Sequence, residues 1–368
     1  MRLAARSVWA RVPATGVAWA VLLVAALALA APAFAQRVEG DRAAAGSVYE
    51  AEVPVRSQAE AEREAGFARA LAQVLGKLSG DRSISARPGV GQELRRAQEY
   101  VKGYDYRQDE GVGASGAPSF STTLVVRFEP EAVDGVVAAL GLPVWPQPRP
   151  KPVLWLAIDD GKGPRLVGLQ HNNAARPVLQ RAIERGYRLG LPSGSAAEQA
   201  AVGAIWRGDT AAIARLSARY QPPMQLLGKL YRDGAGWKAD WVFVDNGRVL
   251  SRWSEANADA RRAMATGADG AADALIRRYA RASSAGAPAS QRIVFTGIRS
   301  GADYLRLATA LQRMSVVRAI RPASASGERL EVDLDLITGM SGFRRTVDGD
   351  VLLELQGGEG ATPVYQLR

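Results

Sequence analysis

The sequence predicts a multi-domain protein of the α+β class, and three observations carry this prediction. Apolar runs of strand length recur between longer segments with helical periodicity. Two segments rich in proline, glycine, serine and alanine interrupt the pattern. The last 80 or so residues alternate in the order strand, helix, strand, strand, helix, strand. With 368 residues, of which 23% are charged, the chain is long enough for two or three globular domains.

Residues 36–142 predict a small N-terminal domain with the element order βα(α)ββα. Residues 47–55 predict a strand, and Ser57 with Glu60 predicts a capping box that opens a helix. A second, shorter helix is expected around 94–101, and a helix starts at Pro130. The helix after Ser57 ends at Gly80 and has one apolar face, formed by Phe67, Leu71, Val74, Leu75 and Leu78. The strand within 118–130 has one apolar face, formed by Phe120, Thr122, Leu124, Val126 and Phe128.

Residues 153–282 predict a central α/β domain that contains an antiparallel meander. An apolar strand starts at Val153, and helices are expected over 174–185, after the capping box of Ser195 and Glu198, and after Asp209. Three alternating runs then follow, separated by Asp-Gly at 233–234 and Asn-Gly at 246–247, which are strong hairpin signals. A helix over 268–279 completes the domain.

Residues 291–368 predict a C-terminal domain with the ferredoxin-like order βαββαβ. The six elements are expected at 292–298, 302–313, 316–320, 330–337, 339–347 and 351–355. Two linkers set the domain boundaries. Residues 143–152 contain five prolines and favour a semi-rigid extended segment, and 283–290, "SSAGAPAS", favours a flexible one.

Residues 1–35 predict a signal peptide. Arg2, Arg6 and Arg11 precede an apolar run of about fifteen residues, shorter than the roughly 20 that span a bilayer. "AFA" provides small residues before a cleavage point after Ala35. The expectation is export to the periplasm with no later membrane span, and an uncleaved N-terminal anchor is the alternative.

The net charge of +10 raises the question of a nucleic-acid partner, which we do not expect. Of the 47 basic residues only six are lysine, and the arginines are scattered along the chain instead of forming one patch. A diffuse attraction to the anionic surface of the outer membrane is a better interpretation of the charge.

The residue types limit the chemistry, and we expect no cofactor and no metal ion. There is no cysteine and only one histidine, His171, which is interpreted as a polar neighbour of a helix start. A Ser-His-Asp triad would need only one histidine, but no G-x-S-x-G motif supplies its serine. The GxGxxG match at 111–116 is followed by a strand where a nucleotide site needs a helix, so it predicts a hairpin loop. Glu331, Asp333 and Asp335 alternate with leucines and valine, which fits the solvated face of a strand better than a calcium or magnesium site.

Asp159 and Asp160 end the apolar strand "VLWLAIDD" and precede Gly161. Paired carboxylates can divide acid and base roles, and strand ends carry ligands in α/β sheets. Asp-Gly followed by Lys-Gly-Pro is also ordinary turn chemistry, which is the favoured interpretation.

The predicted central domain contains a group of tryptophans that includes Trp155, Trp237, Trp241 and Trp253. They are interpreted mainly as core residues. Trp155, Trp237 and Trp241 remain candidates for contact with a ligand or partner.

Several segments resemble a family of exported proteobacterial proteins known as domain of unknown function 2066 (DUF2066). These are "GLPVW", "RPKPVLWLAIDDG", "RGYRLGLP", "LLGKLYRDGAGWKADWVF" and "FTGIRSGADYLRLATALQRM". The resemblance implies an envelope protein of Gram-negative bacteria without an established activity. More loosely, the helix-then-meander block resembles the N-terminal domain of the translocation protein TolB.

These observations favour a non-catalytic periplasmic accessory protein that binds an envelope protein or the anionic outer-membrane surface. The alternative is a carboxylate-dependent glycan or peptidoglycan hydrolase that uses Asp159 and Asp160. The oligomeric state is left open.

Overall fold

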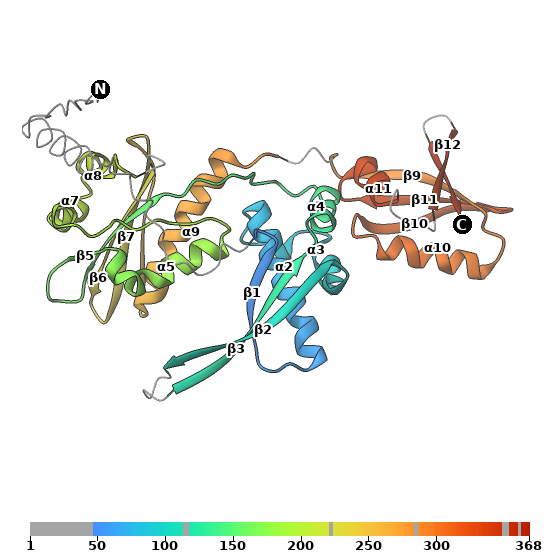
Figure 1. Cartoon of the computed structure of the whole chain (residues 1–368). Helices are drawn as coiled ribbons and strands as arrows, with labels where there is room; N and C mark the ends of the chain where they lie inside the picture. Colours follow the sequence, from blue (N-terminus) through green and yellow to red (C-terminus); the bar gives the residue numbers. More distant parts are fainter. Residues whose placement is uncertain (1–46, 113–117, 221–223, 283–285, 348–352, 360–361) are drawn as a thin grey trace, which may run out of the picture. The chain divides into compact units, whose positions relative to one another are not determined.

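Three separate β-sheets organise the chain, which confirms the coarse prediction of a mixed α and β protein (Figure 1). The computed structural model describes residues 47–112, 118–220, 224–282, 286–347, 353–359 and 362–368. All of these belong to one compact unit, 38–368. The predicted signal peptide and its cleavage point after Ala35 lie outside the described residues.

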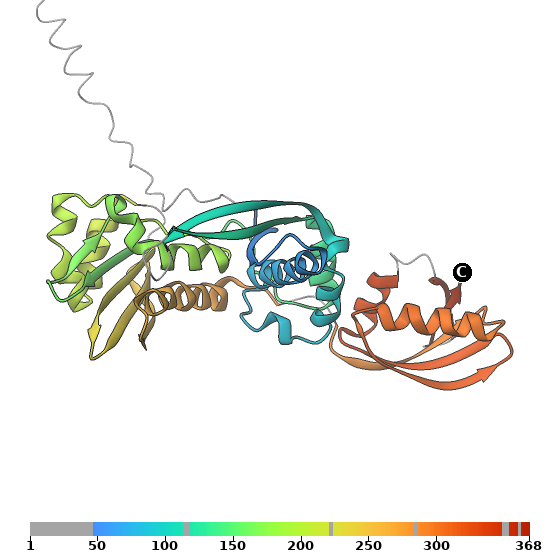
Figure 2. The ribbon, with the colours of Figure 1, turned by 90° about the horizontal axis from the view of Figure 1, so that it is seen from below.

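The first sheet has the strand order β1-β3-β2 and carries helices on one side. Figure 2 shows α2 lying along this sheet beneath the long β2–β3 hairpin. The predicted apolar face of α2 is confirmed, because all five of its residues are buried. The elements are β1 (Glu50–Val55), α2 (Glu60–Ser79), η1 (Ile84–Ala86), α3 (Val90–Arg95), η2 (Ala97–Tyr100), β2 (Val101–Val112), β3 (Pro118–Phe128) and α4 (Pro130–Ala139).

Two details of this part differ from the prediction. The predicted capping box at Ser57 is wrong. α2 begins at Glu60, and the Ser57 hydroxyl accepts a hydrogen bond from the amide of Ala59 instead. Phe120, predicted on a buried face with Leu124, is 68% exposed. The reason is that β1 pairs with β3 only from Thr122 onward, so the outer part of the hairpin has no third strand to cover it.

The second sheet has the order β5-β4-β6-β7-β8. β4 and β6 are parallel, and β6, β7 and β8 form the predicted meander. At the second turn Asn246 and Gly247 both have positive φ, 48° and 76°, as a type I′ turn requires. The elements are β4 (Val153–Asp159), β5 (Arg165–Val167), η3 (Leu169–His171), α5 (Asn172–Glu184), α6 (Ala196–Gln199), α7 (Val202–Arg207), α8 (Thr210–Ser217), β6 (Met224–Asp233), β7 (Gly236–Asp245), β8 (Arg248–Asn257) and α9 (Ala260–Tyr279).

Helices cover both faces of this second sheet. On one face α9 packs against β6, β7 and β8, with Trp241 lying between Gly228 and Gly267. On the other face α7 and α8 cover β4 and β6. The capping box of Ser195 and Glu198 and the Asp209 cap are both confirmed.

The third sheet has the order β10-β11-β9-β13-β12, with α10 lying along one of its faces (Figure 2). The strand predicted at 351–355 corresponds to β12, which begins at Leu353 among the described residues, but the prediction that it is the last element is wrong. Two strands are present, and the second of them, β13, pairs in parallel with β9 while β12 lies outside it. Burial of Tyr365 against Phe343, at 5.4 Å between ring centroids, fixes β13 in the core. The elements are β9 (Ala289–Thr296), α10 (Gly301–Arg313), β10 (Val317–Ser326), β11 (Arg329–Leu336), α11 (Gly339–Val347), β12 (Leu353–Glu359) and β13 (Thr362–Leu367).

The proline-rich segment 143–152 is anchored to its surroundings. The ring of Trp145 is 1% exposed, and its amide donates to the carbonyl of Leu78 at 2.7 Å. Val144 and Arg281 exchange backbone hydrogen bonds. Within the described parts of the chain, no helix is both long enough and apolar enough to cross a bilayer.

Candidate functional site

Asp159 and Asp160 hold the turn after β4. One carboxylate oxygen of Asp159 accepts hydrogen bonds from the amide nitrogens of Gly161 and Gly163, at N–O distances of 2.8 and 3.0 Å. Asp160 accepts the amide of Lys162 and pairs with Arg165 at 2.8 Å. Desolvation opposes ionisation of Asp160, but Arg165 and the Lys162 amide outweigh it and lower the pKa of this carboxyl. Each carboxylate therefore accepts hydrogen bonds within its own loop.

The candidate tryptophans differ in their access to solvent. Trp155 is fully buried, and its indole N–H donates to the Ser217 hydroxyl at 2.8 Å. Trp241 is 1% exposed and stacks on Trp253 at 6.4 Å between centroids. Trp237 is half-buried beneath the guanidinium of Arg232, 4.2 Å from its ring. Trp155 and Trp241 thus lie in the core.

The other motifs singled out in the sequence occupy ordinary structural positions. His171 is exposed at the start of α5. Glu331 lies 4.0 Å from Arg329. Asp333 pairs with Arg292 at 2.8 Å and Asp335 with Arg321 at 2.6 Å. Across the residues with described positions, no cluster of three metal-binding side chains occurs. Gly111 lies within β2 opposite Ser119 of β3, which agrees with the predicted hairpin, and the rest of the motif from 113 onward lies outside the described residues.

The sequence did not predict a cavity of about 390 Å³ beside the end of α7, which we call the α7-side cavity. Its polar floor comes from three neighbouring strands. The register places Lys229 of β6 opposite Asp240 of β7, and Asp240 opposite Ser254 of β8. Trp206 and Arg252 also line this cavity and add an aromatic ring and a positive charge to it. The meander register, fixed by the Asp-Gly and Asn-Gly turns, is the signal that could have aligned these side chains from the sequence.

The α7-side cavity is aromatic and predominantly cationic. Lys229 lies 3.2 Å from Asp240 and 5.8 Å from the ring centre of Trp206. Burial opposes ionisation of Asp240, but hydrogen bonds from Ser254, Lys229 and Tyr231 outweigh it and lower the pKa of this carboxyl. Three cations, Arg207, Lys229 and Arg252, therefore surround a single carboxylate that is already engaged.

A second cavity, of about 450 Å³, lies on the opposite face of β8 and is called the α9-side cavity. Ser251, Trp253 and Glu255 of β8 line it together with residues of α9. The Trp253 indole donates to the Thr266 carbonyl at 3.1 Å, which fixes the ring against α9.

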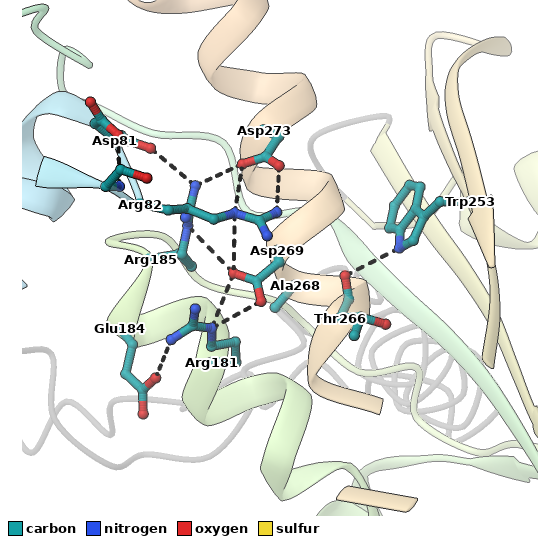
Figure 3. A network of polar contacts seen from close by, with 12 residues as sticks. Asp81, Arg82, Arg181, Glu184, Arg185, Trp253, Thr266, Ala268, Asp269 and Asp273 are labelled. Carbon is teal, nitrogen blue, oxygen red and sulfur yellow. Dashed lines mark hydrogen bonds and ion pairs between the residues drawn. The ribbon is translucent and has the colours of Figure 1, made fainter. Parts of the chain in front are cut away.

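An arginine–aspartate cluster lies beside this second cavity (Figure 3). Asp269 and Asp273, one turn apart on α9, face Arg181 and Arg185, one turn apart on α5. Arg82, which follows α2, also pairs with Asp273. The arginines and aspartates of this cluster pair with one another, so we interpret the cluster as a structural contact that holds the helices together.

A third cavity, of about 320 Å³, lies among β1, α2, β2 and α5. Lys77 is buried at its base and donates to the Glu50 carbonyl at 2.7 Å. Burial lowers the pKa of Lys77. Arg107 at the rim is bound to Glu52 at 2.7 Å and to Asp109 at 2.8 Å, so the charges around this cavity are largely paired with one another.

Comparison with known proteins overturns the family suggested by the sequence. The family described as "Domain of unknown function (DUF8605)" matches residues 26–146, and this is not the predicted DUF2066. The match covers the first sheet with α2 and α4, and none of the strands of the other two sheets. No curated protein matches the chain, and neither does any solved structure.

Proposed function

We propose that this chain is a non-catalytic binding protein of the bacterial cell envelope that recognises a protein partner through its central sheet. The observation that carries the proposal is the α7-side cavity, where Trp206, Lys229 and Arg252 surround one engaged carboxylate. A concave site with an aromatic wall and unbalanced charge suits recognition of an acidic group.

The lowered pKa values of two carboxyl groups, Asp160 and Asp240, favour a binding function over a hydrolase. A glycosidase needs one carboxyl that stays protonated near neutral pH, which requires a raised pKa. The pKa values of Asp160 and Asp240 are lowered instead. The hydrolase alternative thus lacks a suitable acid at Asp160, the partner of Asp159.

The proposal includes three folding units separated near 143–152 and 283–290. The central unit would be comparable to the TolB N-terminal domain, because helices precede a three-stranded meander. The C-terminal unit would be a ferredoxin-like fold extended by one strand, since β13 occupies the place next to β9. The proposed location is the periplasm, after cleavage following Ala35.

Photo-crosslinking in intact cells tests the binding proposal. A photoreactive amino acid replaces Ser254 or Arg207 at the rim of the α7-side cavity, and Ser324 on the exposed strand β10 serves as the control. We expect discrete protein adducts from the two rim positions and none from Ser324. An absence of adducts from both rim positions would contradict the proposal, and sedimentation of the chain with anionic vesicles instead would favour the membrane surface.

Two further measurements test the location and the absence of catalysis. The intact mass of protein from a periplasmic extract should correspond to a chain that starts at Gln36, and a chain that starts at Met1 contradicts cleavage. Purified protein should not release soluble fragments from peptidoglycan. Turnover that disappears when Asp159 and Asp160 are both changed to Asn would instead establish the hydrolase.

A further inference from the structure

β8 is the last strand of the central sheet. In the strand order β5-β4-β6-β7-β8 it is hydrogen-bonded to β7, and no further described strand pairs with its outer side. The outer edge of a strand presents unpaired N–H and C=O groups, which form a template for another strand.

The outer part of this edge, from Ser251 to Asn257, contains no proline and no bulge, although Arg252 and Glu255 place charges on it. From Ser251 to Asn257 the register with β7 is regular, and the single irregularity lies nearer the turn, between Phe243 and Val244 of β7. The edge strand of the third sheet, β10, differs, because it contains Pro322 and two register shifts. Proline and bulges discourage pairing with another chain. β8 is therefore the more receptive edge of the two.

Each face of β8 borders one of the two cavities. Arg252 and Ser254 line only the α7-side cavity, Ser251 and Glu255 line only the α9-side cavity, and Trp253 borders both. Side chains of an added strand alternate between the two faces with a period of two. Recognition by strand addition uses this combination: backbone hydrogen bonds supply affinity, and pockets for alternate side chains supply specificity.

We propose that β8 receives an extended segment of a partner protein as an additional strand, with an acidic side chain of that segment opposite Arg252. The inference rests on the proposed function, since it specifies how the partner binds. Arg252 is exposed and forms no ion pair with any other described residue, so its guanidinium is available. Arg207 and Lys229 add positive charge to the same cavity, which favours a carboxylate further.

Charge complementarity also distinguishes the partner segment from a second copy of this chain. Two copies of β8 paired antiparallel about a two-fold axis would continue the same faces of the sheet. On the face of Arg252, β8 carries Val249, Ser254 and Ala256, and none of these is acidic. A second copy would thus bring no carboxylate to Arg252.

The test uses the mature full-length chain and a capped nonapeptide of alternating threonine and valine with one central glutamate. We expect saturable binding by fluorescence anisotropy, and slower amide hydrogen exchange within 251–257 when the peptide is present. Arg252→Glu should weaken binding at least about tenfold, and a peptide with lysine in place of glutamate should bind this variant better than it binds the original chain.

Two matched controls isolate strand pairing from general charge effects. Arg318→Glu makes the same change of charge on the exposed edge strand β10, and the affinity should stay within about twofold. A peptide methylated on alternate backbone amides keeps its side chains but loses its strand hydrogen bonds, and it should not bind.

Several results would overturn the inference. They are no saturable binding up to about 1 mM peptide, equal weakening by Arg252→Glu and Arg318→Glu, hydrogen-exchange protection outside β8, or a stable dimer by light scattering that Arg252→Glu dissociates. If photo-crosslinking at Ser254 still gives protein adducts while any of these results is found, the proposed binding function is supported and strand addition at β8 is wrong.

Discussion

Arg185 of α5 donates to Asp273 of α9 at 2.8 Å, and the side chain of this arginine is only 7% exposed. The same guanidinium donates to the carbonyl of Gly80 at the end of α2, at 3.1 Å. Burial lowers the pKa of Arg185, while Asp273 opposes that shift. One buried cation therefore joins three helices through a carboxylate of α9 and a backbone carbonyl after α2.

Replacing Arg185 should destabilise the protein strongly. Arg185→Met keeps the length of the side chain but removes the donor of the Gly80 carbonyl and leaves Asp273 with Arg82 alone, so the free energy of unfolding should fall by about 2 kcal/mol. Urea denaturation followed by circular dichroism measures this change. The control is Arg299→Met, because Arg299 and its partner Glu328 are 71% and 61% exposed and such pairs contribute at most about 1 kcal/mol. Equal losses in the two variants would contradict the role of the buried cluster.

Gly267 of α9 should tolerate no side chain. A Cβ atom at this position would lie 2.5 Å from the ring of Trp241, which is itself held against the sheet. Gly267→Ala should therefore lower the free energy of unfolding by about 2 kcal/mol through overpacking. Gly135 in α4 is the control: it has open space around it, so Gly135→Ala should raise stability by about 0.5–1 kcal/mol through helix propensity. Thermal denaturation of both variants checks the opposite signs.

Glu198 should make folding stability depend on pH in the acid range. Burial opposes ionisation of Glu198, but hydrogen bonds from Tyr220 and Ser193 and from the amide of Ser195 outweigh it and lower the pKa of this carboxyl. Because the folded-state pKa lies below the unfolded value of about 4.3, the stabilisation is present above that pH and is lost as the pH falls through the folded-state pKa.

Glu198→Gln provides the measurement. At neutral pH the variant should be less stable by about 2 kcal/mol, because hydrogen bonds to a charged acceptor are lost. The stabilities of the two proteins, from urea denaturation between about pH 3 and pH 7, should converge as the pH falls. A difference that stays constant over this range would show that ionisation of Glu198 does not contribute.

The sequence predicted the elements whose signals are local. The meander turns follow from Asp-Gly and Asn-Gly, and the buried face of α2 follows from its periodicity. Asp159 and Asp160 also fit local turn chemistry. β13 was missed because the glycine-rich residues before it read as the end of the fold, and its parallel pairing with β9 joins segments about 70 residues apart.

The two sites that the structure adds depend on contacts that no local pattern encodes. Arg185 and Asp273 are 88 residues apart, and their meeting depends on how α5 packs against α9. The α7-side cavity needs the register of three strands and the position of α7 at once. The predicted capping box at Ser57 shows the converse. The local sequence motif is present, but the helix begins only at Glu60, three residues after Ser57, so the motif does not cap it.

Limited proteolysis of the mature chain with a nonspecific protease should cut within 283–290 before it cuts within 143–152. Residues 286–288 are exposed and precede β9, whereas the proline-rich segment is held by the buried ring of Trp145 and by Arg149, which donates to the Gly186 carbonyl at 2.6 Å. Proteases cut where the backbone is exposed and free to move. Trp145→Ala should remove the anchor and bring cleavage of 143–152 forward to the rate of the other boundary. First cleavage at 143–152 in the original chain would contradict the anchoring of this segment by Trp145, whereas first cleavage inside α9 would contradict the proposed division into folding units.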